Sequence, residues 1–316
     1  MIRVRTLAAV AMLAGSCCAL AQNVVPPPGA EVTVVAERPG PRLWRVINGD
    51  HTVWILGTQT PVPQNMRWRS AEVERAIAGA DEVLGAYSVS LSIADLELPT
   101  PEPLKRVLSR KQYTRWVAMR DKYIDPHVQT EKMLPTAAAL FLQSGAYEHV
   151  ALTSTEEIWS TIHDLARLHN VPIRSQAFTV QPDTSIKINR REARRSGVLF
   201  LMETMDKLDT ELAMSGRRAN AWADGDLAEL RRLAPTDEAY AASFARSWPF
   251  LSPAEVDHII AQEDTRLAAV FEGALRRNHS TFAALPVYLL MKRNGALSIL
   301  SAAGYRVEQP ADEAAE

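Results

Sequence analysis

Two runs rich in β-branched and aromatic residues begin the regular pattern of the chain, at 43–47 and 52–56. Asn48 and Gly49 stand between them, and Asn-Gly is a strong short-range signal for a β-hairpin because both residues tolerate the positive φ angles of a tight turn. Gly57 follows the second run. The pattern therefore predicts two strands joined by a tight turn, with a glycine at the end of the second.

Beyond this hairpin the apolar positions follow a helical period for most of the chain, beginning with 69–78 and continuing through 131–147. Three serines precede side chains that can complete a capping box, which is a typical helix start. These pairs are Ser109 with Gln112, Ser154 with Glu157, and Ser252 with Glu255, the last with Pro253 at the first helical position. The middle of the chain is therefore expected to be helical.

Short strand-like runs return later, at 171–173 after a helix that ends near Asn170, and at 280–285 and 305–307 around a helix at 295–303. Strands near both ends of a chain with a helical middle are typical of an α/β or α+β fold. We therefore expect a central mixed sheet, built from strands near both termini and surrounded by a large helical middle region.

The first 21 residues have the pattern of a cleavable signal peptide. Arg3 and Arg5 precede a short apolar run at 7–14, and small residues end at Ala19-Leu20-Ala21. The run is shorter than the ~20 apolar residues that a membrane-spanning helix needs. We expect cleavage near Ala21 and a periplasmic or secreted mature protein.

Both cysteines, Cys17 and Cys18, lie within this leader, so no disulfide or thiol chemistry is expected in the mature chain. Lipidation at Cys17 is the alternative. It is disfavoured because Ala14-Gly15-Ser16 lacks the large aliphatic residue that usually stands three positions before a lipidated cysteine.

The remaining chain divides into a Pro/Gly-rich segment at 22–41, expected to be flexible, one folded domain at 42–309, and an acidic tail at 310–316. Without Arg3 and Arg5 there are 33 basic and 37 acidic residues, a net charge of −4, which argues against nucleic-acid binding. The one basic patch is interpreted as a solvated helix face. It consists of Arg190, Arg191, Arg194 and Arg195.

The common catalytic motifs are absent: the sequence has no H-E-x-x-H, no G-x-S-x-G and no phosphate-binding glycine-rich loop. Glu255 and His258 have the i, i+3 spacing of some metal ligands, but one pair does not make a site, and Glu255 already has a capping role. His163, Asp164 and His169 are placed on largely different faces of a helix and are interpreted as surface residues.

The hairpin carries a histidine and two tryptophans, which are residue types that can bind a ligand. His51, which follows the turn, is expected to face solvent. Trp44 and Trp54 are interpreted as one face of a core sheet rather than as part of a binding box.

Several segments, taken together, resemble the TraB/GumN family, which is related to the Tiki proteases. At the start these are Leu43 to Val46, Thr52 to Thr58, Trp68-Arg69-Ser70 and Ala80-Asp81-Glu82; later they are Trp222 to Leu227, Thr281 to Ala284, Gly295-Ala296-Leu297 and Gly304 to Val307. The resemblance extends from Leu43 to Glu308, which is nearly all of the mature chain. It implies an α/β fold in which two Gly-x-x-His motifs and associated glutamates hold a divalent metal for hydrolysis.

The corresponding positions in this sequence lack those ligands. The first motif reads Gly57-Thr58-Gln59-Thr60, and the second reads Pro286-Val287-Tyr288-Leu289. The expected glutamates fall at Gly85-Ala86 and at Gln176-Ala177. Hydroxyl, leucine and alanine side chains cannot replace imidazole and carboxylate as ligands of zinc, manganese or iron. The remaining histidines also lack a matched set of partners in the sequence. No metal cofactor, metal ligand or catalytic residue is therefore expected in this protein.

Two functions remain as hypotheses. In the first, the protein is a pseudoenzyme that binds an unidentified protein or peptide partner in the periplasm, with no membrane span and no nucleic acid. In the second, it is a metal-dependent peptidase or hydrolase whose chemistry has been relocated, with Glu255, Asp257 or His258 as candidates.

Overall fold

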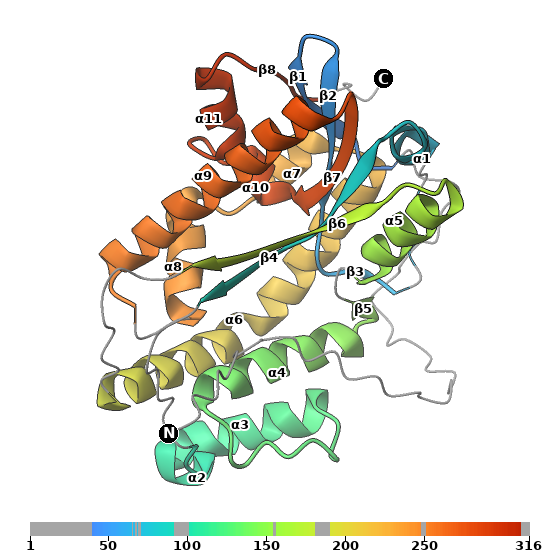
Figure 1. Ribbon diagram of the computed structural model, residues 1–316. Helices are drawn as coiled ribbons and strands as arrows, with labels where there is room; N and C mark the ends of the chain where they lie inside the picture. Colours follow the sequence, from blue (N-terminus) through green and yellow to red (C-terminus); the bar gives the residue numbers. More distant parts are fainter. Residues whose placement is uncertain are drawn as a thin grey trace, which may run out of the picture.

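The computed structural model describes residues 40–64, 66, 68, 71–91, 101–153, 156–180, 190–247 and 251–310. Its centre is a six-stranded sheet in the order β6-β4-β7-β2-β1-β8 (Figure 1). The strands of this sheet are β1 (Leu43–Asn48), β2 (His51–Thr58), β4 (Glu82–Leu91), β6 (Ile173–Val180), β7 (Ser280–Pro286) and β8 (Arg306–Glu308). A separate two-stranded sheet pairs β3 (Val62–Pro63) with β5 (Leu152–Thr153).

The sheet contains strands from both ends of the chain and is mixed, as the sequence predicted. β6, β4, β7 and β2 run parallel to one another, whereas β1 is antiparallel to β2 and to β8. In the central pair Thr52 lies opposite Ser280 and Thr58 opposite Pro286. Four parallel strands therefore bring their carboxyl ends to one edge of the sheet, where ligand sites of open α/β sheets are usually found.

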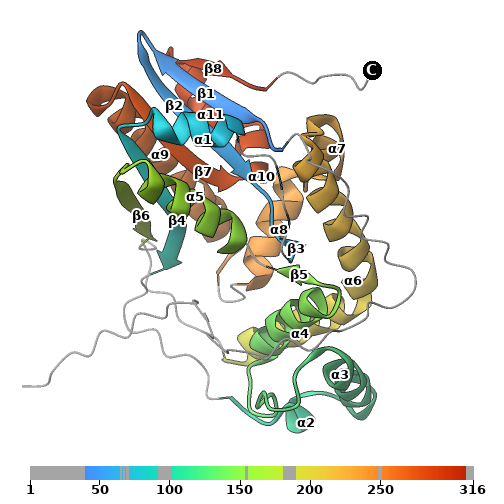
Figure 2. The same ribbon diagram turned by 90° about the vertical axis from the view of Figure 1, so that its right-hand side faces the viewer.

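Helices cover both faces of the sheet (Figures 1 and 2). α1 and α5 lie on one face, and α9 lies on the other with α10 and α11. The helices are α1 (Ala71–Ala78), α2 (Leu104–Val107), α3 (Arg110–Tyr123), α4 (Pro135–His149), α5 (Glu156–Leu168), α6 (Arg190–Asp224), α7 (Leu227–Leu233), α8 (Asp237–Ser247), α9 (Pro253–Arg277), α10 (Val287–Met291) and α11 (Ala296–Ala302).

The core has two main parts. One surrounds the sheet and includes the fully buried Trp44, Trp222 and Phe282. The other lies among α2, α3, α4 and α6, around the fully buried Trp116 and Leu142. The long helix α6 contributes to both, since its first half carries Leu201 in the helical core and its last turns carry Trp222 in the sheet core. It thus connects the helical region to the sheet.

The local signals of the sequence agree well with these elements. The hairpin turn is at Gly49, whose φ is +61°, and Ser109 and Ser252 each form the capping box expected of them. Ser154 lies outside the described residues. Two expectations were wrong. Residues 131–134 precede α4 instead of belonging to it, because Pro135 stands in its first turn. Residues 82–91, within the stretch expected to be helical, form the strand β4.

The two tryptophans of the hairpin do not share a face, which corrects the sequence interpretation. Trp44 lies opposite Ile55, and Arg45 lies opposite Trp54. Since cross-strand neighbours project to the same side, Trp44 and Trp54 project to opposite sides of the sheet. Trp44 is buried, whereas Trp54 is half-buried beneath the Arg45 guanidinium, 5.3 Å from its ring centre.

The expected signal peptide at 1–21 and most of the 22–41 segment lie outside the described residues, as does the tail beyond Pro310. Gly40 and Pro41 are described and buried, and the Gly40 amide donates to the Ala223 carbonyl at 3.1 Å. No helix within the described ranges has the length and apolar character needed to cross a membrane.

Candidate functional site

The two sequence motifs meet at the carboxyl edge of the parallel strands. Gly57 and Thr58 end β2, and Pro286 ends β7 directly beside them. The chain continues from β2 through Gln59 to the exposed Thr60, and from β7 into α10, where Leu289 is buried. The fold thus brings the two motifs to one place, as the family resemblance implied.

Gly57 is required there by close packing. A Cβ atom at this position would lie 2.8 Å from Cζ3 of Trp44 and 2.9 Å from Cγ2 of Val287, both shorter than real side-chain contacts. The Gly57 carbonyl also accepts a hydrogen bond from the buried Trp222 indole, with a donor–acceptor distance of 2.5 Å. The glycine of the first motif therefore has a structural role that does not depend on a metal.

The two positions expected to carry glutamates lie on the neighbouring strands. Ala86 is exposed in β4, at an irregularity where the register with β6 shifts between Leu84 and Tyr87. Ala177 pairs with Ser88 of β4. Ala86 thus lies in the middle of β4 and Ala177 in the carboxyl half of β6, whereas Thr60 and Leu289 follow the ends of β2 and β7. None of the four side chains offers an imidazole or carboxylate.

A buried carboxylate lies close to this edge, held by tyrosines that sequence reasoning did not single out. Glu263 on α9 is only 7% exposed. Its Oε1 accepts a hydrogen bond from the Tyr87 hydroxyl at 2.9 Å, and its Oε2 accepts one from Tyr240 at 3.4 Å. The Tyr240 and Tyr288 rings lie next to each other, with centroids 5.0 Å apart. The cluster therefore joins β4, α8, α9 and α10.

Burial dominates the ionisation of this cluster. Removal from water raises the pKa of Glu263 above its ordinary value, although the hydrogen bond from Tyr87 and the charge of Lys292 oppose the shift. Burial also raises the pKa of Tyr288 to about 12, and raises the pKa values of Tyr87 and Tyr240 further. The tyrosines therefore stay protonated near neutral pH and act as hydrogen-bond donors.

The next residue of α9, Asp264, forms a buried ion pair with Lys292, and each side chain is 7% exposed. Burial raises the pKa of Asp264, while the Lys292 ammonium lowers it. Lys292 also lies 5.7 Å from the Tyr240 ring centre. The Ala296 amide favours the ionised aspartate, but Oδ1 makes no hydrogen bond of normal geometry within the described part of the chain. One buried carboxylate oxygen is thus left with unused acceptor capacity.

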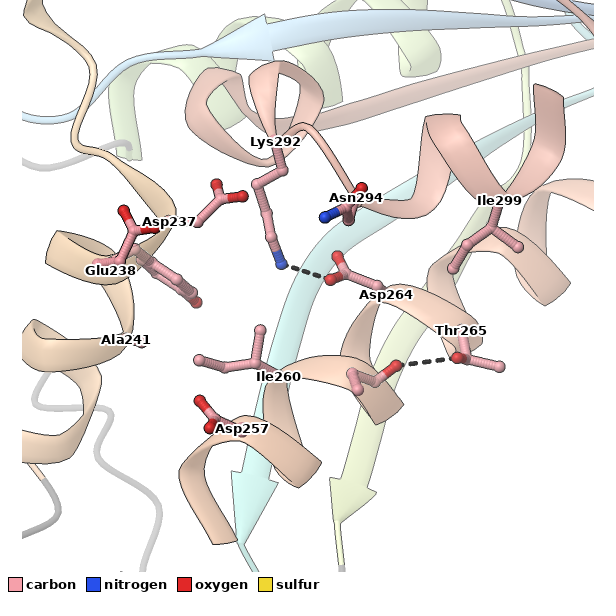
Figure 3. A pocket seen from close by; sticks show the side chains of 12 residues that line it. Asp237, Glu238, Ala241, Asp257, Ile260, Asp264, Thr265, Lys292, Asn294 and Ile299 are labelled. Atoms are coloured by element: carbon pink, nitrogen blue, oxygen red, sulfur yellow. Dashed lines mark hydrogen bonds and ion pairs between the residues drawn. The ribbon is translucent and has the colours of Figure 1, made fainter. Parts of the chain in front are cut away.

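A pocket of about 380 Å³ opens beside this ion pair, between α8, α9 and the α10–α11 connection (Figure 3). In Figure 3 the Lys292 and Asp264 side chains point toward each other at its wall, with Asp237 and Glu238 on the α8 side and Asp257 below. Four carboxylates against one ammonium give the lining an acidic character. Tyr240, Asp264 and Lys292 belong both to the pocket and to the buried cluster.

The other candidates from the sequence do not converge here. Glu255 completes the capping box of α9, and His258 is hydrogen-bonded through Nε2 to the Gln262 amide at 2.7 Å. Of the three proposed residues on α9, only Asp257 lines the pocket. His163 and Asp164 project from α5, whereas His169 follows that helix and lies 3.4 Å from Glu74. Exposed Arg191, Arg194 and Arg195 fit the predicted solvated face.

A second group of chemically active side chains lies at the opposite, amino end of β2 and β7. Asp50, His51 and His279 are the one set of three metal-ligating residue types that comes together within the described ranges. His51 is half-buried and was wrongly expected to face solvent, and the view that the histidines lack matched partners was wrong for this residue. The sequence did not indicate that His279 lies beside His51, because 228 positions separate the two residues.

Comparison with known proteins identifies the family of the chain. A sequence profile described as the TraB/PrgY/gumN family matches residues 42–309, which is most of the chain. The chain belongs to this family. Searches among curated proteins and among solved structures gave no significant match. Two of the segments that carry the family resemblance contact each other in the structure, because the Trp222 indole donates a hydrogen bond to the Gly57 carbonyl.

Proposed function

We propose that this TraB/PrgY/gumN protein is exported and works in the periplasm as a pseudoenzyme, that is, as a binding protein built on a hydrolase scaffold. The observation that carries the proposal is the composition of the carboxyl edge of the sheet. Thr60, Ala86, Ala177 and Leu289 occupy the positions where the family resemblance implies metal ligands. A site without ligands cannot lower the pKa of a metal-bound water, which is the basis of metal-dependent hydrolysis.

The acidic pocket beside this edge supports a binding role and indicates the chemistry of the ligand. Asp237, Glu238 and Asp257 outnumber the single Lys292, which is already paired with Asp264. A peptide segment bearing lysine or arginine side chains, or a free amino terminus, would meet complementary charge here. We therefore propose a positively charged peptide or protein segment as the bound partner.

The test compares short fluorescent peptides rich in lysine with matched peptides rich in glutamate, by fluorescence anisotropy at two salt concentrations. The lysine peptides are expected to bind, and the double variant Asp237→Asn/Asp257→Asn should weaken binding. The single variant Glu238→Gln should also weaken binding. Its matched control is Glu72→Gln, which changes an exposed acid of α1 on the opposite face of the sheet. Equal binding of both peptide classes, or equal losses in Glu72→Gln and Glu238→Gln, would count against the proposal.

The alternative, a hydrolase with relocated chemistry, predicts peptide cleavage that is sensitive to a chelator or to substitution on α9. Its candidate residues Glu255 and His258 make local contacts within the helix instead of converging on the pocket. Peptide hydrolysis assayed with and without EDTA separates the two functions. Cleavage that disappears in His258→Ala would favour the enzyme.

Export is a separate part of the proposal and rests on the signal-peptide pattern of the first 21 residues. The mature protein is expected to begin at or near Gln22 and to be released by osmotic shock. Mass spectrometry of the purified N-terminus checks this. A retained leader, or a lipid-bearing Cys17, would contradict cleavage near Ala21.

A further inference from the structure

The pairing of β2 with β7 brings two histidines together at the amino ends of the strands. Thr52 lies opposite Ser280 in register, so the residues that precede them, His51 and His279, are neighbours. The Thr52 amide donates to the His279 carbonyl at 2.8 Å, which fixes the two backbones relative to each other. Asp50 stands beside them in the turn of the hairpin. Two imidazoles and a carboxylate therefore meet at the amino ends of these strands.

The distances within this group suit a shared ligand. The two imidazole rings are stacked, with centroids 4.6 Å apart and planes inclined by 24°. The Asp50 carboxylate lies 3.5 Å from His51 Nε2 and 3.5 Å from His279 Nδ1, each through a different oxygen. One donor atom from each of the three residues lies within 4.8 Å of the other two.

The His51 ring is already oriented for metal binding. Its Nδ1 lies 2.6 Å from the Asn278 carbonyl oxygen. Because a carbonyl can only accept, Nδ1 must carry the proton, and in the neutral ring the lone pair is then on Nε2, which faces Asp50. A backbone carbonyl behind a histidine is the usual outer contact that fixes the tautomer of a metal ligand.

We propose that Asp50, His51 and His279 form a binding site for one zinc ion. Two imidazole nitrogens and one carboxylate oxygen are a common ligand set for Zn²⁺, and they leave a fourth position open to water or to a partner's side chain. Zinc–ligand bonds of about 2.0–2.2 Å require the three groups to draw closer. The Asp50 and His279 side chains are 78% and 75% exposed, so neighbouring atoms leave them room to rotate.

This site goes beyond the proposed binding function and is independent of it. It lies at the amino ends of β2 and β7, whereas the family positions and the acidic pocket belong to the carboxyl side of the sheet. The prediction that no metal binds at Thr60, Ala86, Ala177 and Leu289 is therefore unaffected. Zinc bound at the amino end would be held by residues that lie outside the family motifs.

The test is titration of untagged, chelator-treated protein with zinc chloride by isothermal calorimetry, supported by the visible absorption spectrum of the Co²⁺ form. We expect one ion per chain, with cobalt bands typical of nitrogen and oxygen ligands. Loss of one ligand should weaken binding by at least about tenfold, since even outer contacts of metal ligands contribute 10- to 100-fold. His51→Ala, His279→Ala and Asp50→Asn should each show this loss.

His258→Ala is the matched control, because its imidazole is exposed on α9 and contacts Gln262. It should bind zinc as the unmodified protein does. Because Asp50 and His279 are exposed, their variants are expected to fold, which melting curves without metal will verify. Absence of zinc binding at millimolar concentration would overturn the proposal. So would zinc binding that survives in the double variant His51→Ala/His279→Ala, or that is lost equally in His258→Ala.

Discussion

The two ends of β2 and β7 form opposite environments from the same pair of strands. At the carboxyl end Gly57 packs against Trp44 and Val287, and the position expected to carry a histidine holds the buried Leu289. At the amino end the half-buried His51 and the exposed His279 lie beside an exposed aspartate. Strand pairing thus juxtaposes residues at both ends, and the side chains present decide whether the result is core packing or a candidate ligand site.

The largest expected effect comes from a substitution at the carboxyl end of β2 and β7, called here the packed end. Leu289→Ala should destabilise the protein by about 2–5 kcal/mol, because it removes buried methyl groups and leaves a cavity. His279→Ala at the open end, measured without metal, should change stability by no more than about 0.5 kcal/mol, as for most surface substitutions. Urea unfolding followed by circular dichroism measures both. Similar losses in the two variants would contradict the contrast between the ends.

The second prediction concerns a variant that restores, at the packed end, the metal ligands that the family resemblance implies. The triple change Thr60→His/Ala86→Glu/Leu289→His should gain zinc affinity if these positions converge. The background is His279→Ala, which removes the proposed site at the other end. Zinc at 100 times its Kd should then stabilise the folded state by about 2.7 kcal/mol.

The control for this gain is the His279→Ala background without the three restoring changes, which should show no zinc-dependent rise in melting temperature. Because Leu289 is buried, the restored variant must first show a cooperative melting transition without metal. A folded variant with no gain would contradict convergence of the three positions.

A third prediction tests the close packing at Gly57. Gly57→Ala should cost about 1–3 kcal/mol, since the added methyl group would overlap Trp44 and Val287. Gly216→Ala is the matched control, because it lies within α6 and its added Cβ would meet no atom within 4 Å. The control should be neutral or stabilising by up to about 1 kcal/mol, as expected for glycine in a helix interior. Thermal melting distinguishes the two outcomes.

The smallest expected effect concerns the pH dependence contributed by Glu263. The groups facing it are Tyr87, Tyr240, Tyr288, Asp264 and Lys292. Because burial raises the pKa of Glu263 in the folded state, the folded protein binds more protons than the unfolded chain between the two pKa values. Its contribution to stability is therefore fully present below the unfolded pKa and is lost as pH rises through the folded pKa.

Glu263→Gln removes this titration while keeping an oxygen that accepts from Tyr87. The decline in stability as pH rises above the ordinary glutamate pKa should therefore be less steep in the variant than in the unmodified protein. Urea midpoints measured at several pH values check this. An unchanged pH profile would show that Glu263 does not contribute the expected proton uptake.

Much of the fold was accessible from local signals. The hairpin, the capping boxes at Ser109 and Ser252, and the terminal strands were predicted because each depends on a few adjacent residues. The turn itself is formed by Gly49 and Asp50, one residue later than the expected Asn48-Gly49, since Asn48 pairs with His51. β4 was missed, since a strand between helices in a parallel sheet lacks the clear alternation of an exposed one. The family resemblance located the motif positions, which local patterns alone would not have related to each other.

The sequence by itself determined the family, the mixed α/β architecture and the absence of imidazole and carboxylate groups at Thr60, Ala86, Ala177 and Leu289. The tertiary structure decided which distant groups meet. Glu263 reaches Tyr87, and His51 reaches His279, across separations of 176 and 228 positions. Such contacts depend on the register of parallel strands and on helix packing against the sheet, and neither leaves a periodic signal at the residues concerned.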